Sequence, residues 1–436
     1  MIKDLVLDGG GKRMTVHVVG IGEDLRSISK RYRVSMNSIM SVNGLPSAAA
    51  LVPGLALYIP DNTLPIRGYR IKAGDDIWQL AKKFNSNLSM IHAANHGIDP
   101  NHLHIGQIIN IPSAIKLKMA VLGFLVPSEL TTTLSLIESL SHQLTYLAVV
   151  AYSFTNQGFA YNQIEDSAIV TKCKQVNITP LLMIRNFTTQ GFSPELAGGV
   201  LENQSYRENL VASIVTLTRQ RGFDGVSLDF EFIPPARRND FNLFLAELKS
   251  ALGDLLLQVN VHAKSADLPT NRIVGAYDYA AIGKVVDLMA VMTIDYGYPS
   301  GPPAPIAPYE WIEQVIQYAL TQLPPQKLLM ALPLYGYDKD ATTYTTRGLS
   351  VLAAQSQAIS KRTTIQFDNT AKSPWYRYWL GTKEHIVWFA DIRSYTEKYK
   401  LIDIYQLAGL TLWQISLSAP QHWAYVGKNI SVLKKS

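Results

Sequence analysis

The sequence predicts an α/β protein: a (β/α)8 barrel with an α+β insertion after its seventh strand, preceded by two small βααβ units. Three observations in the 436 residues predict this fold class. A repeat with a constant offset fills the first quarter of the chain. Eight apolar strand-like runs then alternate with helical stretches from about 119 to 416. A segment from about 337 to 390 is too long for a single connection.

The N-terminal repeat aligns residues 20–32 with residues 72–84 at an offset of 52, and the match continues downstream without a gap. In each unit a β-like run precedes a glycine turn, and an acidic residue after the turn caps the first helix. A second helix is expected at roughly 36–42 and 88–95, before a closing strand that ends in a proline. The two units are assigned to residues 15–61 and 67–113.

Both units resemble the LysM module in the opening glycine turn, a central asparagine (Asn43 and Asn95) and a closing strand that begins after Gly54 or Gly106. The resemblance implies binding of glycans that contain N-acetylglucosamine, in a shallow groove between the two turns. Tandem copies suit avidity on a repeating polymer. A small folding domain without a ligand is the alternative. Both glycines suit turns with positive φ under either interpretation.

Residues 118–436 are expected to form the barrel, with the inserted subdomain at about 337–390. Strands alternating with helices indicate a parallel sheet, and eight such units over about 300 residues indicate closure into a barrel. A doubly wound open sheet is disfavoured because no glycine-rich phosphate turn follows the first strand. The expected strands are 119–126, 145–152, 179–185, 224–232, 256–262, 287–296, 328–336 and 408–415.

The fourth expected strand carries the chemistry, in the segment "GFDGVSLDFEFIPP". With a period of two, Ser227, Asp229 and Glu231 face the barrel interior, and four apolar residues that include Phe232 face the helices. Repulsion between the two carboxylates raises one pKa, as a general acid near neutral pH requires. Glu231, nearest the C-terminal face, is the expected proton donor.

A metal site or a buried ion pair is the alternative interpretation of these carboxylates. No histidine stands at ligand spacing in this strand, and two carboxylates hold magnesium loosely. We therefore expect neither a metal nor another cofactor.

This strand resembles the signature D-x-x-D-x-D-x-E of glycoside hydrolase family 18, with Asp224, Asp229 and Glu231 at matching positions and Ser227 in place of the second acid. The resemblance implies substrate-assisted, retaining catalysis. The substrate's acetamido oxygen attacks the anomeric carbon, Glu231 protonates the leaving oxygen and then activates water, and Asp229 orients the acetamido group. The serine is expected to alter the pH profile without abolishing activity.

Other segments resemble the family's substrate-binding positions. "MTIDYG" places Asp295 near the sugar, but Ile294 replaces the motif's tyrosine, so Tyr296 or Tyr298 would have to substitute. "GLTLWQI" places Trp413 beneath the sugar at the cleavage site, where an aromatic face stacks well on a pyranose ring. "LPLYGYD" places Tyr335 at the cleft edge. The expected substrate-binding residues are therefore Asp224, Ser227, Asp295, Tyr296, Tyr335 and Trp413.

The complete layout resembles the spore cortex-lytic members of this family, which implies an N-acetylglucosaminidase that acts on peptidoglycan or cortex glycan. The net charge of +6 favours anionic polymers, and no dense basic block favours nucleic acid. No run approaches the roughly 18 apolar residues of a membrane span. The resemblance implies a spore protein, of cortex or coat. Charged residues interrupt the apolar start, so we expect the protein to be made without a signal peptide.

Two other functions stay open from the sequence. Ser227 and Ile294 are compatible with a catalytically weak barrel that only binds glycan in the spore coat or cortex. A chitinase is the other alternative, and the lack of a recognisable secretory signal disfavours it.

Overall fold

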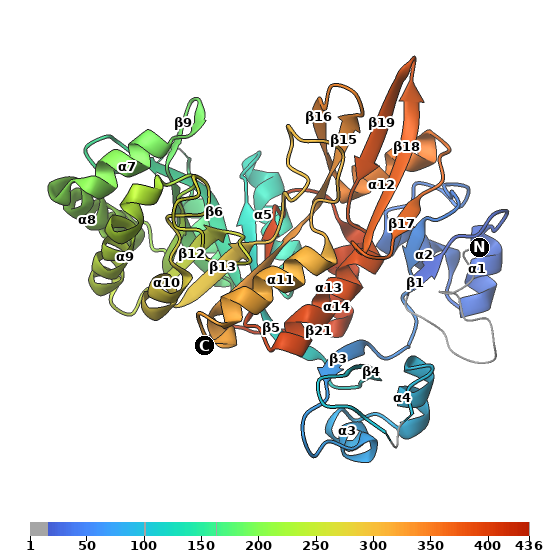
Figure 1. Cartoon of the computed structure of the whole chain (residues 1–436). Coiled ribbons are helices and arrows are strands. Elements are labelled where there is room, and N and C mark those ends of the chain that lie inside the picture. Colours follow the sequence, from blue (N-terminus) through green and yellow to red (C-terminus); the bar gives the residue numbers. More distant parts are fainter. Residues whose placement is uncertain (1–15, 100–101, 163, 436) are drawn as a thin grey trace.

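The computed structural model describes residues 16–99, 102–162 and 164–435, and Figure 1 shows their arrangement. The N-terminal segment, on which the expectation of no signal peptide rests, lies outside the described residues, as does residue 15 at the start of the first repeat. Within the described part of the chain, no helix has the length and apolar character needed to cross a bilayer.

Each N-terminal repeat folds as a βααβ unit, as predicted. The first consists of β1 (Val16–Val18), α1 (Leu25–Tyr32), α2 (Met36–Asn43) and β2 (Ala56–Tyr58). The second consists of β3 (Ile66–Arg70), α3 (Ile77–Lys83), α4 (Leu88–Ala94) and β4 (Ile108–Pro112). The two strands of each unit pair antiparallel. Asp24 and Asp76 cap the first helices, because each carboxylate accepts a hydrogen bond from a backbone N–H three residues on.

The central asparagine of each repeat ties its second helix to its closing strand. The Asn43 Nδ2 donates to the carbonyls of Ile39 and Tyr58 (2.7 and 2.8 Å), and its Oδ1 accepts from the Tyr58 N–H (2.7 Å). Asn95 makes the same three bonds fifty-two residues later, with Ile91 and Asn110. The repeated asparagine is thus a structural residue that satisfies buried backbone groups.

Eight parallel strands close into a barrel, because β5 pairs both with β6 and with β20. The fourth, sixth and seventh strands end earlier than predicted, at Asp229, Met292 and Pro333. The barrel strands are β5 (Leu117–Leu125), β6 (Tyr146–Phe154), β8 (Thr179–Arg185), β11 (Gly225–Asp229), β12 (Leu256–His262), β13 (Leu288–Met292), β14 (Leu328–Pro333) and β20 (Gly409–Trp413).

Helices surround the barrel, and the main core lies between them and the strands. A second, smaller apolar cluster that includes Leu122, Leu181 and Leu329 fills the barrel interior. The surrounding helices are α5 (Leu130–Ser139), α6 (Ser167–Gln175), α7 (Pro194–Glu202), α8 (Gln204–Gln220), α9 (Arg238–Leu252), α10 (Tyr279–Val285), α11 (Tyr309–Leu320), α13 (Ile392–Tyr405) and α14 (Pro420–Asn429).

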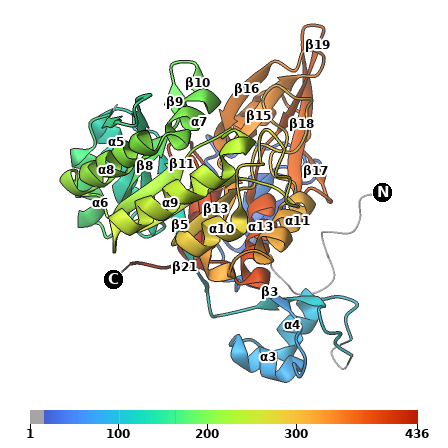
Figure 2. The same ribbon diagram turned by 60° about the vertical axis from the view of Figure 1, so that its left-hand side comes forward.

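An α+β insertion follows the seventh barrel strand, as predicted. Its antiparallel sheet has the order β16-β15-β19-β18-β17, and α12 (Val351–Ser360) packs on it. The strands are β15 (Tyr335–Asp340), β16 (Thr346–Ser350), β17 (Gln366–Asp368), β18 (Ser373–Leu380) and β19 (Lys383–Trp388). Four short strands complete the fold: β7 (Ala160–Asn162), β9 (Phe187–Thr188), β10 (Gly191–Phe192) and β21 (Ile430–Val432). The sheet and the β9–β10 hairpin rise on the same side of the barrel (Figures 1 and 2).

The two N-terminal units attach to the rest of the chain in different ways. The first shares a single hydrophobic core with the insertion, in which Leu57 and Ile28 lie with Tyr376 and Phe389. The second has a core of its own and meets α13 through a bidentate ion pair. In that pair, Arg67 Nε and Nη2 donate to the two carboxylate oxygens of Asp403 at 2.5 and 2.8 Å.

Replacing Gly54 by alanine should destabilise the chain more than replacing its counterpart Gly106. Both glycines have positive φ (81° and 87°), so the backbone strain of about 1–2 kcal/mol is shared by the two variants. At Gly54 a Cβ would lie 1.8 Å from the carbonyl oxygen of Ile365, whereas at Gly106 it would meet no described atom within 4 Å. Thermal unfolding should show a lower main transition for Gly54→Ala than for Gly106→Ala. Equal shifts would contradict the docking of the first unit.

Candidate active site

Polar and aromatic side chains gather where the parallel barrel strands end. Arg185, Asp229, His262 and Trp413 are the last residues of β8, β11, β12 and β20, and Glu231 follows β11. Carboxyl ends of parallel strands share one face of a barrel, which is the face where barrel enzymes bind their substrates. We call this face the mouth. It lies on the side from which the β9–β10 hairpin and the inserted sheet rise (Figure 2).

The strand β11 keeps the predicted alternation only as far as Phe230. Val226, Leu228 and Phe230 lie in the core beneath the helices, while Asp229 faces the interior. The prediction that Phe232 also faces the helices is wrong. Phe232 has a φ of 55°, and its ring contacts His262 at the mouth, with centroids 5.1 Å apart. The period of two ends because the strand itself ends at Asp229.

Asp229 is buried, with 5% of the residue exposed. Burial, followed by the charge of Glu231, raises the pKa of the Asp229 carboxyl from 3.8 to about 8. A hydrogen bond from Asn260 Nδ2 (3.1 Å) and the positive charge of Arg185, its register neighbour on β8, act in the opposite direction. Asp229 is therefore a carboxylic acid that keeps its proton at neutral pH in the free protein.

Glu231 is held from its backbone. The Asn186 side chain accepts from the Glu231 N–H (2.8 Å) and donates to the Glu231 carbonyl (2.9 Å). The Tyr277 hydroxyl donates to the carbonyl of the preceding Phe230 (2.7 Å). The Glu231 side chain is 17% exposed, and its Oε2 lies 3.3 Å from His262 Nε2. These contacts fix a partly accessible carboxylate at the mouth.

A series of uncharged side chains, joined by hydrogen bonds, lies beneath Asp229. The Ser227 hydroxyl donates to Gln258 Oε1 (2.5 Å), and Gln258 Nε2 donates to Asn260 Oδ1 (2.8 Å). Asn260 then donates to Asp229. Ser227 is fully buried, so the structure does not expose it to a ligand at the mouth. It lies at the far end of a relay that orients Asp229.

Asp295 connects the barrel to the insertion. Its Oδ1 accepts hydrogen bonds from the hydroxyls of Tyr335 (2.6 Å) and Tyr337 (2.7 Å), both on β15. Solvent reaches the residue, yet protein atoms surround its carboxylate, and this desolvation raises its pKa. Trp413 is half-buried at the end of β20, with its ring centroid 5.6 Å from that of Phe124. Asp295, Tyr335 and Trp413 therefore all lie where strands of the mouth end.

Besides the buried Ser227, two of the expected substrate-binding residues make their side-chain contacts away from Asp229 and Glu231 in the described structure. Asp224 precedes β11 at the opposite end of the barrel, where its Oδ1 lies 3.1 Å from Lys174 Nζ on α6. Its position at the amino end of a parallel strand rules out contact with a sugar at the mouth. Tyr296 is 51% exposed, and its ring lies against Trp311 of α11, with centroids 5.3 Å apart. Tyr296 directly follows Asp295 in the chain, but among the described residues no hydrogen bond joins its side chain to Asp295, Glu231 or Tyr335.

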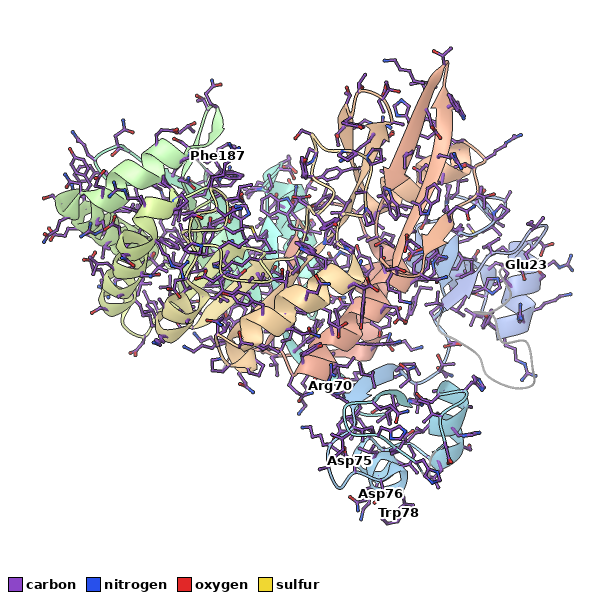
Figure 3. The ribbon with its side chains drawn as sticks, in the orientation of Figure 1. Glu23, Arg70, Asp75, Asp76, Trp78 and Phe187 are labelled. Carbon is purple, nitrogen blue, oxygen red and sulfur yellow. The ribbon has the colours of Figure 1, made fainter. Side chains whose placement is uncertain are left out.

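Several residues of the site were not predicted from the sequence. Gln258, Asn260 and His262 were within reach, because the segment "LLQVNVH" alternates apolar and polar residues along a predicted strand. Asn186 and Tyr277 lie between elements and carried no local signal. An aromatic row at the mouth was also missed, formed by Phe187, Phe192 and Phe232 in successive edge contacts. The Phe187 of the β9–β10 hairpin is labelled in Figure 3.

The arrangement offers acid–base chemistry on a bound sugar or another polar substrate. A protonated carboxylic acid and a partly exposed carboxylate share the mouth with aromatic surfaces and a second carboxylate bridged to tyrosines. A buried, protonated acid beside a more accessible carboxyl suits general acid and base roles. Among the described residues, no group of three or more His, Cys, Asp and Glu side chains is arranged to hold a metal ion.

Comparisons with known proteins agree with this geometry. Residues 121–417 match the family "Glycosyl hydrolases family 18", and residues 17–60 and 69–112 match "LysM domain". The chain is 31% identical over 435 residues to the cortical fragment-lytic enzyme of Bacillus subtilis (strain 168), covering 97% of this chain and 100% of that protein.

Two solved structures are similar over nearly the whole chain. The Bacillus cereus spore cortex-lytic enzyme SleL is 28% identical with a TM-score of 0.84, and the similarity covers 96% of this chain and 98% of that chain. The enzyme of the same name from Bacillus megaterium QM B1551 is 28% identical with a TM-score of 0.80, covering 97% and 99%. The chain therefore belongs to glycosyl hydrolase family 18 and carries two N-terminal LysM domains.

Proposed function

We propose that this glycoside hydrolase cleaves N-acetylglucosaminyl bonds in spore cortex peptidoglycan or its fragments, by substrate-assisted, retaining catalysis. The observation that carries the proposal is the buried acid Asp229 two residues before the accessible Glu231 at the barrel mouth. Similarity to cortex-lytic enzymes over nearly the full chain supports the choice of substrate. The same similarity supports a location in the spore, at the cortex or coat.

Glu231 acts as the general acid and then as the general base. The acetamido oxygen of the substrate attacks the anomeric carbon while the bond from that carbon to the leaving oxygen breaks. Glu231 gives its proton to the leaving oxygen, and an oxazolinium ion remains. Water then attacks the anomeric carbon and gives a proton back to Glu231, while the bond from that carbon to the acetamido oxygen breaks and the acetamido group re-forms. The two displacements at the same carbon retain its configuration.

Asp229 orients and stabilises the attacking group. Its carboxyl accepts a hydrogen bond from the acetamido N–H, which strengthens as positive charge develops on the oxazolinium ion. That bond favours the ionised form of Asp229, so its proton becomes available to Glu231. The relay through Asn260, Gln258 and Ser227 holds the Asp229 carboxyl in place with neutral groups. These three are positioning residues in the proposal.

Asp295, Tyr335 and Trp413 bind the sugar at the cleavage site. Trp413 offers a half-buried ring on which the apolar face of a pyranose stacks. The hydroxyls of Tyr335 and Tyr337 hold the Asp295 carboxylate, which accepts hydrogen bonds from the sugar. Ile294 has no hydroxyl at the family's tyrosine position, and the hydroxyls beside Asp295 are those of Tyr335 and Tyr337.

The domain division proposed for this function follows the sequence argument. The LysM domains occupy 15–61 and 67–113 and supply the glycan binding, and 118–436 is the catalytic domain with the insertion at about 337–390. Peptidoglycan is the proposed partner. The proposal involves no cofactor.

Replacing Glu231 by glutamine should lower fragment release from spore cortex by roughly 10²–10⁴-fold, the usual contribution of general acid–base catalysis. The amide keeps the size of the side chain but has no proton to give. Mass spectrometry of released fragments measures the effect, and Glu208→Gln, at an exposed position on α8, is the matched control. Equal release by wild type and Glu231→Gln would favour a glycan-binding protein without catalysis.

Removing the acetyl group from the substrate should abolish cleavage at the modified sugar. A free amine has no carbonyl oxygen to attack the anomeric carbon, so the route through the oxazolinium ion is closed. Chemically N-deacetylated cortex fragments and untreated fragments can be compared by product mass spectrometry. Comparable cleavage of both would contradict the proposal, because the nucleophile would then not be the acetamido oxygen.

Replacing Asp229 by asparagine should stabilise the fold increasingly as the pH rises from about 4 to about 8. Folded Asp229 keeps a proton that the unfolded chain releases above a pKa of 3.8. Its contribution to stability is therefore fully present below that value and is lost as pH rises through about 8. Asparagine does not titrate, and its Oδ1 still accepts from Asn260.

Denaturant unfolding at several pH values measures this difference, and activity should be lost in the same variant. The gain at pH 8 relative to pH 4 should be on the order of 5 kcal/mol, because the folded and unfolded pKa values of Asp229 differ by about four, at about 1.4 kcal/mol each. Asp254→Asn, at an exposed turn, is the matched control substitution. A constant difference between wild type and Asp229→Asn across the range would refute the raised pKa.

A further inference from the structure

The same end of the two LysM domains has different neighbours: it contacts the insertion in the first domain and is exposed in the second. In each domain the turn that precedes the closing strand lies beside the first glycine turn. The Gly54 N–H donates to the carbonyl of Val19 (2.8 Å), and the Gly106 N–H donates to the carbonyl of Ile71 (2.8 Å). The two turns therefore meet at one end of each domain. We call this the turn end.

In the first domain one of the two turns at this end is part of an internal contact, whereas the glycine turn with Ile21 and Gly22 is exposed. The Ile365 N–H donates to the carbonyl of Pro53 (3.0 Å), and Arg393 Nη2 donates to the carbonyl of Gly54 (3.2 Å). No side chain fits at Gly54, because its Cβ would collide with the Ile365 carbonyl. The insertion therefore covers the Pro53–Gly54 turn of this domain.

Side chains of the catalytic domain also form hydrogen bonds with the central asparagine of the first domain. Gln355 Nε2 donates to the Asn43 carbonyl (2.8 Å), and Gln421 Nε2 donates to Asn43 Oδ1 (2.8 Å). The same Gln421 nitrogen donates to the Ala56 carbonyl (2.7 Å). All four residues of this contact are buried. The counterpart Asn95 bonds Ile91 and Asn110 of its own domain.

In the second domain the turn end is open. A Cβ at Gly74 or Gly106 would meet no described atom within 4 Å. Trp78 on the first turn of α3 is 63% exposed, and Ile105 before Gly106 is 74% exposed. The domain meets α13 through β3, and Figure 3 shows Asp76 and Trp78 at its end farthest from the barrel.

We propose that the second LysM domain alone attaches the enzyme to insoluble cortex glycan, with Trp78 stacking on a sugar ring. In this proposal the first LysM domain has a structural role, as a packed part of the catalytic unit. This inference rests on the proposed function for the identity of the glycan. An exposed indole suits an uncharged pyranose, because its face contacts the C–H groups of the ring. At the corresponding position the first domain has Arg26.

Co-sedimentation of the full-length chain with purified insoluble cortex peptidoglycan tests the proposal. Trp78→Ala should weaken binding on the order of tenfold, the effect of losing one well-placed aromatic contact. Arg26→Ala changes the matched position of the first domain and should stay within about twofold of wild type. Ile21→Ser is the second control, because Ile21 is the exposed apolar side chain at the first turn of that domain (93% exposed).

Hydrolysis of soluble cortex fragments separates failure of this proposal from failure of the proposed function. All three variants should cleave soluble fragments at the wild-type rate, because none lies at the mouth. Wild-type binding of cortex by Trp78→Ala, or an equal loss in Ile21→Ser, would overturn the division between the domains. Failure of the wild-type chain to cleave soluble fragments would instead refute the catalytic proposal and leave the binding comparison intact.

Discussion

The structure depends on holding Asp229 and Glu231 close together at the end of one strand, with Asp229 out of water. Two ionised carboxylates in that position repel each other and lose solvation, so one of them keeps its proton. The barrel supports this state with neutral groups: Asn260 donates to Asp229, and Gln258 and Ser227 stand behind Asn260. A family acid at position 227 would add a charge to the relay. Serine keeps it neutral.

A second line of contacts joins the N-terminal domain to the mouth. The first LysM domain shares its core with the inserted sheet, and that sheet supplies Tyr335 and Tyr337 to the Asp295 carboxylate. The insertion is thus held from both sides, by the LysM domain and by the barrel. A loss of packing in the first domain would reach the substrate-binding residues through β15. This continuity gives the first domain a structural role whether or not it binds glycan.

The sequence predicted those features that repeat or alternate locally. The offset of 52 located both βααβ units and their capping aspartates, and the alternation along β11 placed Asp229 in the barrel. Features that depend on neighbouring strands were missed. The hydrogen bonds from Ser227 through Asn260 depend on the register between β11 and β12, which the sequence does not show. The hydrogen bonds between Asn186 and the Glu231 backbone depend on the conformation of a loop. Asp224 matched a family motif by position, but a motif does not show which end of a strand faces the substrate.

Titration of the aspartate carboxyl carbons by NMR, in protein labelled at those carbons, tests the central claim most directly. The account predicts that one aspartate in the free enzyme titrates near pH 8, and that its resonance is absent from Asp229→Asn. Titration of every aspartate in the acidic range of ordinary carboxyl groups would contradict it, because Asp229 would then be ionised at neutral pH beside Glu231.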